Sequence, residues 1–518
     1  MAIALVFCPL QMRADTVVTT LASSTAGPPT HPTRVSGPSP FAAGCVTSPF
    51  TFEINYRNAE VEPWIAVDPT NPNHLIGVWQ QDRWQFGGSH GLMTGVSWDG
   101  GFTWNRTFAH FSTCAGGTAA NGGNYERASD PWVTISPTHV AFQISLSFNF
   151  RDPNNAILVS RSFDGGQTWA EPVTLLLDTG PLVFNDKESI TANPTNSRFV
   201  YAVWDRVVSD NDGNVLADPT WFARTKDGGD SWEPAHAIFD PGAGNGTIGN
   251  QIVVLPNGTL VNVFTLIKDI NSFTATLSIA IIRSQNKGLT WSRPITIATA
   301  DAIGVIDPKT GERVRTGGGL PAIAVDRETG ALFVVWQDAR FSGKQRDGVA
   351  FSKSTDGGLH WTTPVQINKV PAVQAFTPSI AVGDEGKVSV TYYDFRKDNA
   401  DPNVLLTSYW RITSPNGGRT WHEVPVAGPF DLRTAPRTSS CCGGFFLGDY
   451  QGIVPRGESF TPMNVLANSG NISNRTDVFV TAQEEEGDTS WNGHVERNGH
   501  PQSPRDLVIT HWERRPPH

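Results

Sequence analysis

The sequence carries little charge, since only 17% of its 518 residues are Asp, Glu, Lys or Arg. Acidic residues outnumber basic ones by 49 to 39, and the resulting net charge of −10 argues against a nucleic-acid-binding protein. Methionine and tyrosine are scarce, with four and seven residues. No apolar run reaches the roughly 18 residues that a membrane span needs, so we expect no transmembrane helix.

Turn-forming and large aromatic residues are abundant instead. The chain has 50 glycines, 37 prolines and 17 tryptophans, which favours many short strands joined by turns over a helical bundle. We therefore predict an all-β protein. The length alone suggests about three domains of roughly 150 residues, but internal repeats override that expectation.

The N-terminus resembles an export signal. Residues 2–10 are mostly apolar and polar residues follow them, although no Lys or Arg precedes them. We expect residues 1–20 to be a signal peptide and residues 21–54, which are rich in Pro, Ser and Thr, to be a flexible leader. The protein is then secreted.

Five cysteines are present, and Cys8 would leave with the signal peptide. The other four allow three disulfide pairings in an oxidising compartment, and Cys45–Cys114 with Cys441–Cys442 is one of them. No second Cys or His lies at ligand spacing from the vicinal pair, so we expect no metal site there and no cofactor.

One short motif recurs six times. Each copy places Asp or Asn close to one or two glycines and ends in tryptophan, as in SFDGGQTW. Tight turns need a residue with positive φ, and a short acceptor side chain can hold their backbone N–H groups, so each copy predicts a hairpin turn. The copies end at Trp104, Trp169, Trp232, Trp291, Trp361 and Trp421.

A second repeat precedes each turn motif and consists of two apolar runs around a Pro, Gly or Asn turn. Its copies begin at Glu62, Asp130, Glu188, Gln251, Leu320 and Thr377, and a seventh begins at Gly448 without a later turn motif. Each unit thus predicts four antiparallel strands. Repeated four-stranded units are typical of a β-propeller, and we predict seven blades, with six as the alternative, in a single domain over residues 55–518.

The turn motif has the form S-x-D-x-G-x-x-W, the Asp-box. With these boxes between the third and fourth strands, the chain resembles the sialidase superfamily of Asp-box (BNR) propellers over roughly residues 55–512. The resemblance implies a substrate funnel at the face opposite the boxes. It also implies an exo-glycosidase, although such propellers include lyases, other glycosidases and receptors.

Glycoside cleavage needs an acid and a nucleophile or base, and tyrosine takes the second role in sialidases. Two tyrosines stand beside a carboxylate near the start of a first strand, and two carboxylates are candidate acid/base groups. A histidine in the loop after Arg83 is a further acid/base candidate. The catalytic candidates are Tyr450 with Asp449, Tyr125 with Glu126, Asp130, Glu188 and His90.

Several cations are candidate substrate ligands. An aromatic-Asp-Arg pattern recurs in four loops, where the arginines either clamp a carboxylate or pair with the Asp of their own loop, and for the set we favour the pairing. The candidates are Arg83, Arg127, Lys187, Arg206, Arg315, Arg340 and Arg396. Sialidases open their first blade with Arg-Ile-Pro, but this chain reads Val61-Glu62-Pro63, and Val61 cannot hold a carboxylate.

Our leading hypothesis is a secreted, monomeric, sialidase-like exo-glycosidase that removes a terminal acidic sugar from glycans. The first alternative is a polysaccharide lyase, in which His90 or a tyrosine abstracts the C5 proton of a uronate. The second is a propeller that binds glycans without cleaving them. All three predict a glycan partner and no nucleic acid.

Overall fold

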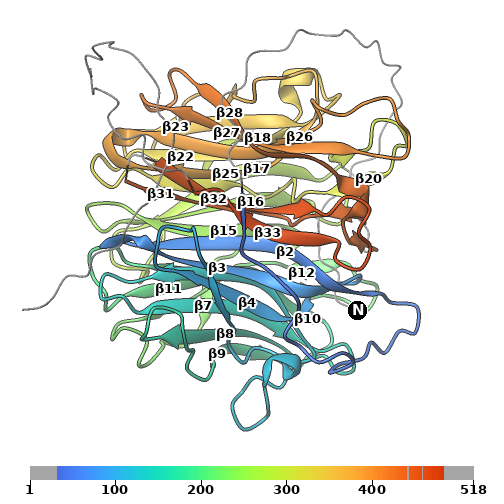
Figure 1. Cartoon of the computed structure of the whole chain (residues 1–518). Helices are drawn as coiled ribbons and strands as arrows, with labels where there is room; N and C mark the ends of the chain where they lie inside the picture. The colour runs from blue at the N-terminus through green and yellow to red at the C-terminus, as the bar shows by residue number, and fades with distance from the viewer. Residues whose placement is uncertain (1–31, 273, 440–442, 458, 483–518) are drawn as a thin grey trace, which may run out of the picture. The chain divides into compact units, whose positions relative to one another are not determined.

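The computed structural model describes residues 32–272, 274–439, 443–457 and 459–482. Apart from four 3-10 helices of three residues each, all regular structure in these residues is β-strand (Figure 1). The prediction of an all-β protein is confirmed. No helix in the described part of the chain is long and apolar enough to cross a membrane.

Most strands follow one another in antiparallel groups of four along the chain. The first groups are β2 (Asn55–Asp68), β3 (Asn71–Trp84), β4 (Ser89–Ser97) and β5 (Asn105–Thr107); then β6 (Arg127–Ile135), β7 (Ala141–Phe148), β8 (Asn155–Ser162) and β9 (Val173–Asp178); then β10 (Val183–Ala192), β11 (Val200–Ser209), β13 (Thr220–Thr225) and β14 (His236–Phe239), with the short β12 (Val215–Ala217) at the edge of β11.

The later groups repeat the pattern. They are β15 (Gly246–Val254), β16 (Leu260–Lys268), β17 (Thr276–Ser284) and β18 (Ile295–Ala300); β21 (Ala322–Val325), β22 (Leu332–Asp338), β23 (Gly348–Ser354) and β24 (Val365–Gln366); β25 (Ala375–Val382), β26 (Val388–Asp394), β27 (Leu406–Ser414) and β28 (His422–Asp431); and β31 (Gly452–Arg456), β32 (Ser459–Ala467) and β33 (Thr476–Val480) with β1 (Thr33–Arg34).

The first strands of these groups contact one another in chain order, and β31 contacts β2, which closes a ring. This is a β-propeller of four-stranded antiparallel blades. A smaller sheet lies outside this series. It joins β19 (Val305–Ile306) and β20 (Arg313–Arg315) to β30 (Gly444–Phe446) and β29 (Arg437–Thr438).

The predicted count of seven blades, or alternatively six, is wrong for the sheets as they are hydrogen-bonded. Five sheets of four or five strands stand alone, and the remaining strands form one sheet of twelve. The reason is a single bridge on each side of the first group. Ala59 pairs with Thr476, and Ser89 pairs with Ala128, which joins three neighbouring groups into one ladder.

Each recurrent turn motif connects the third and fourth strands of its group. In the turn between β8 and β9, the Asp164 carboxylate accepts bonds from Ser162 Oγ at 2.7 Å and from the Thr168 amide at 2.9 Å. Gly166 has a φ of 92°, and a Cβ there would lie 2.9 Å from Val96 of the preceding group. The glycine thus provides both the turn conformation and the close packing between groups.

The two ends of the described chain meet at one edge. Thr33 and Arg34 of β1 pair with Val480 and Phe479 of β33, and Ser36 Oγ donates to Asp477 at 2.7 Å. Residues 33–41, predicted to belong to a flexible leader, are therefore part of the folded domain, because this short strand completes the last group.

Three predictions about the ends have different outcomes. The disulfide Cys45–Cys114 is present, as in one of the three predicted pairings. Cys441 and Cys442 lie outside the described residues. So does the predicted signal peptide, residues 1–20.

Candidate active site

Five first strands carry a β-bulge at the same place, where two residues stand unpaired opposite the neighbouring strand. The first bulged residue of each has a positive φ, which is uncommon outside glycine and costs energy that functional sites often tolerate. These residues are Glu62 (53°), Asp130 (49°), Lys187 (52°), Gly249 (74°) and Thr377 (51°). The repeat thus places the first bulged residue of each of these five groups at an equivalent position.

A cavity lies where these bulges meet. The space between its lining atoms totals about 500 Å³, of which about 30 Å³ admits the centre of a water molecule. It is therefore narrow, with room for roughly two or three waters. Polar lining residues include Lys187, Glu188, Asn250, Gln251, Thr377, Asp449, Tyr450 and Gln451.

Lys187 is the centre of a buried ionic cluster. Its Nζ lies 2.7 Å from Asp130, 2.9 Å from Asp449 and 3.5 Å from Glu62. Burial alone would lower the pKa of Lys187, but the surrounding carboxylates hold it well above its usual value. The ammonium group is therefore a fixed positive charge beside the cavity.

Asp449 is the ionised carboxylate of the cluster. Arg315 reaches it from β20 with two parallel hydrogen bonds, one of them 3.0 Å from Nε to Oδ1. Burial would raise the pKa of Asp449, yet Arg315 and Lys187 hold it far below the usual range. The guanidinium groups of Arg315 and Arg83 lie 5.0 and 4.8 Å from the centre of the Phe446 ring. Phe446 belongs to β30, so the smaller sheet outside the series of blades positions these two cations.

Other carboxyl groups nearby behave in the opposite way. Burial raises the pKa of Glu62 to about 7 and that of Asp186 to about 6. Burial, followed by the charge of Asp130, raises the pKa of Glu188 well above its usual value. Glu188 Oε1 accepts the Leu146 amide, whereas Oε2 is buried without a partner in the part of the chain that the structure describes.

Tyr450 packs on two tryptophans at the cavity wall. Trp64 and Trp132 stack with their ring centroids 3.4 Å apart, and Tyr450 lies 5.4 Å from Trp132. The Tyr450 hydroxyl donates to the Pro131 carbonyl at 3.2 Å. Burial and the neighbouring carboxylates raise its pKa well above the usual value, so it is a neutral phenol.

Sequence reasoning missed both tryptophans, although a signal was present. Trp64 ends the triplet Glu-Pro-Trp and Trp132 ends Asp-Pro-Trp, at the same place in two consecutive repeats. An acid-Pro-aromatic triplet that recurs at the bulge indicates that the two aromatic side chains line the same cavity wall, in addition to their role in the fold.

Four of the predicted site residues lie elsewhere and do not line the cavity. Tyr125 is buried in a small apolar core. Glu126 pairs with Arg151 on the surface. Arg127 makes two bonds with Glu53, at 2.8 and 2.7 Å, and His90 of β4 is buried against Asp82 at 3.1 Å.

The remaining loop arginines also have partners away from the cavity. Arg340 bonds Asp338 and Arg396 bonds Asp394, each within its own loop, as the pairing hypothesis states. Arg206 differs, since it binds Asp178 at 2.8 Å rather than the Asp of its own loop. In this structure these arginines hold loops in place.

The fold and the turn motifs define a β-propeller built from BNR-like repeats. Residues 219–435 match the family model described as BNR repeat-like domain. This match confirms BNR-like repeats in this part of the predicted propeller. No curated protein matches the chain.

Similar solved structures are distant in sequence. A Hadza microbial sialidase is 15% identical and covers 80% of this chain and 75% of its own, with a TM-score of 0.44. A Penicillium chrysogenum α-L-arabinanase, complexed with arabinobiose, is 11% identical and covers 83% and 98%, with a TM-score of 0.43. An ulvan lyase of polysaccharide lyase family 25 is 10% identical and covers 64% and 76%, with a TM-score of 0.42.

Proposed function

We propose that the protein is a secreted glycoside hydrolase that removes a terminal sugar from glycans. The observation that carries the proposal is a pair of carboxyl groups on one cavity, Glu188 and Asp449, whose surroundings drive their pKa values in opposite directions. Such a pair supplies the proton donor and the anion that glycoside cleavage uses. The Cys45–Cys114 disulfide supports an oxidising compartment.

In this proposal Glu188 is the general acid. Its raised pKa favours the protonated form, and its Oε2 atom, which has no partner among the described residues, can donate to the leaving oxygen. Asp449 stays ionised and stabilises the positive charge that develops on the sugar ring. Tyr450, beside Asp449, is the candidate nucleophile, and to attack it must release its bond to Pro131 and give its proton to a carboxylate.

The charges of the cluster favour a neutral terminal sugar over the acidic sugar that the sialidase resemblance implies. Lys187 and Arg315 are already paired with carboxylates, and Arg83 is buried and donates to Gln80 at 2.6 Å. A sugar carboxylate would have to displace these partners. The lyase hypothesis has less support, because His90 does not line the cavity.

The test compares neutral aryl glycosides, a fluorogenic sialoside and a uronate polysaccharide, the last monitored by the absorbance of an unsaturated sugar. We expect release from a neutral glycoside and a fall in activity as the pH rises through the pKa of Glu188. Glu188→Gln should lower kcat on the same substrate by about 100-fold or more. Glu171→Gln, at an exposed ion pair with His110, is the matched control and should change little.

Each other result has a defined meaning. Full activity in Glu188→Gln would remove this residue from the mechanism. An unsaturated product would identify a lyase, and sialoside release would restore the acidic-sugar hypothesis. If the protein is folded by circular dichroism and has no activity on any of these substrates, the result would support a glycan-binding propeller.

A further inference from the structure

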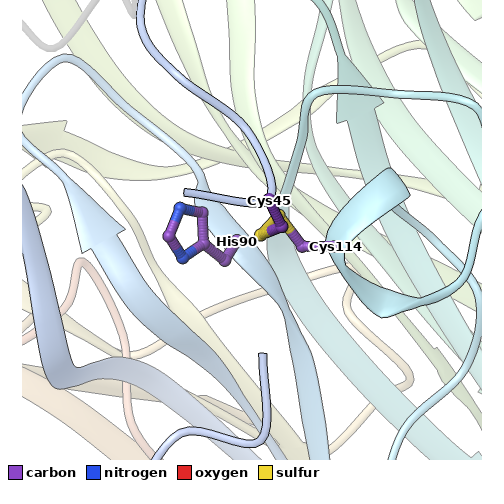
Figure 2. Close-up of side chains that lie close together, drawn as sticks. All are labelled: Cys45, His90 and Cys114. Atoms are coloured by element: carbon purple, nitrogen blue, oxygen red, sulfur yellow. A yellow bond between two sulfur atoms is a disulfide. The ribbon is translucent and has the colours of Figure 1, made fainter. Parts of the chain in front are cut away.

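His90 is buried and lies beside the Cys45–Cys114 disulfide (Figure 2). One ligand atom from each of Cys45, His90 and Cys114 lies within 4.8 Å of the others. Cys45 belongs to the segment between β1 and β2, and Cys114 to the helical turn η1 (Thr113–Ala115). Three separate segments of the chain therefore bring two sulfurs and an imidazole together.

The imidazole of His90 is held in a defined orientation. Its Nδ1 bonds the Asp82 carboxylate at 3.1 Å, and Asp82 also accepts Ser39 Oγ at 2.6 Å and the Asn58 amide at 2.8 Å. With only 3% of His90 exposed, its Nε2 has no hydrogen-bond partner among the described residues. Leaving a buried polar atom unpaired is unfavourable, so this nitrogen is available to a ligand.

In a second buried His–Asp pair of the chain, both ring nitrogens of the histidine have hydrogen-bond partners. His74 bonds Asp68 through Nδ1 at 3.2 Å and the Gly165 carbonyl through Nε2 at 3.0 Å. His90 also has a carboxylate partner on Nδ1, but its Nε2 has no partner among the described residues, and the two sulfurs lie close to the ring. A carboxylate on one imidazole nitrogen, with the other left free, is the arrangement that supports metal-ligating histidines.

We infer that, once the disulfide is reduced, Cys45, Cys114 and His90 form a binding site for a thiophilic metal ion such as Zn²⁺. A dithiol reductant supplies two electrons and two protons, which break the S–S bond and give two thiols. The metal ion displaces these two protons and takes two thiolates and His90 Nε2 as ligands, with water in the fourth position.

The site is gated by oxidation state. In the disulfide the sulfurs are bonded to each other, so no thiolate is present to bind a metal. Both cysteines are partly exposed, which lets a small reductant reach them. The metal ion then replaces the disulfide as the link between the Cys45 segment and η1.

Co²⁺ and Zn²⁺ are the probes. The full-length protein carries Cys8→Ser, Cys441→Ser and Cys442→Ser, so that the other thiols do not contribute. Treated with a non-metal-binding phosphine reductant, it should bind one Co²⁺ per chain with a thiolate-to-cobalt charge-transfer band, and Zn²⁺ should displace the cobalt. The oxidised protein should show no band.

Variants separate the three ligands from their surroundings. Cys45→Ser and Cys114→Ser should each abolish the band, and His90→Ala should weaken Co²⁺ binding at least 10-fold. His74→Ala, at the other buried His–Asp pair, should leave binding unchanged. A band that survives His90→Ala, or a reduced folded protein that binds no Co²⁺, would overturn the inference.

Reduction itself could unfold the chain, and circular dichroism then becomes the readout. In that case Zn²⁺ added with the reductant should restore the β-sheet spectrum in the background protein but not in His90→Ala. Failure of Zn²⁺ to restore it would also overturn the inference.

Discussion

At the scale of single residues, the surroundings shift the pKa of the same chemical group in opposite directions within one cluster. Arg315 and Lys187 hold the pKa of Asp449 far below its usual range, whereas burial and the charge of Asp130 raise the pKa of Glu188 well above its usual value. Sequence reasoning placed both residues near the start of first strands, where the structure brings them to one cavity. It could not give the pKa shift of Asp449, because this shift depends on Lys187 and Arg315, which are 262 and 134 positions away along the chain.

Tyr125 and Glu126 were predicted to be catalytic residues, but the structure places them away from the cavity. Both are near the start of a first strand, as Asp130 is, but they precede the bulge by four or five residues. A bulge reverses which residues face inward, and alternation of apolar and polar residues does not reveal its position. Gly249, a glycine at one of the five equivalent places, is one sequence signal of the bulge.

Asp347 provides a pH prediction that is independent of catalysis. Burial raises its pKa from 3.8 to about 6, although the Ile303 and Gly304 amides donate to it. A group with a raised folded-state pKa contributes stability that is present below about pH 4 and is lost as the pH rises through 6, here about 3 kcal/mol. Asp347→Asn should therefore flatten the decline in unfolding free energy between pH 4 and 7.

Urea unfolding at several pH values measures this slope. The comparison is between slopes, so a constant loss from a missing hydrogen bond does not affect it. Asp240→Asn, on an exposed turn, is the control. An unchanged slope in Asp347→Asn would show that this carboxyl does not titrate in that range.

At the scale of elements, the recurrent turn is the most predictable part of the molecule. All six motifs lie between third and fourth strands, because an acceptor side chain and a glycine with positive φ are local requirements. The number of separate sheets was less predictable. It depends on the bridges Ala59–Thr476 and Ser89–Ala128. Each bridge joins residues of two different repeats, and the sequence of neither repeat contains a pattern that predicts it.

The chain itself offers a matched pair for testing the turn. Asp164 accepts Thr168 Oγ1 at 2.6 Å, whereas Asn286, in the same place of another repeat, donates to Thr290 Oγ1 at 2.8 Å. A threonine hydroxyl can donate or accept, so both residues satisfy the turn. Asp164→Ala should lower the free energy of unfolding by about 1–2 kcal/mol, and Asp164→Asn by less than about 0.5 kcal/mol.

Chemical denaturation of the two variants measures the difference. Equal losses would mean that the side chain fills space rather than accepting bonds. No loss in either would mean that the glycines alone determine the turn.

At the scale of the whole molecule, the last group of strands is completed by a strand too short to recognise in the sequence. β1 has two residues, yet Ser36 beside it donates to Asp477 and accepts the Val478 amide at 2.9 Å. Ser36→Ala should lower the midpoint of global unfolding, with a loss of about 1–3 kcal/mol, because it leaves buried partners unpaired. Ser272→Ala, in an exposed turn, is the control.

Two probes distinguish a global role of β1 from local fraying. Tryptophan fluorescence and far-UV circular dichroism should shift together in Ser36→Ala if the β1 contact stabilises the whole propeller. If only proteolysis near residue 36 increases while both midpoints stay fixed, β1 is a peripheral strand and this argument fails.

The β1–β33 pairing also constrains how the protein is made. Ser36 and Asp477 are 441 positions apart, so the partner of the first strand leaves the ribosome long after that strand does. Until then, the edges of β2 and of β1 have no strand beside them and are open to pairing with other nascent chains. Slow elongation should therefore favour aggregation. A circular permutant with its chain ends in a turn between two other groups should shorten the time between the synthesis of β1 and that of its partner β33.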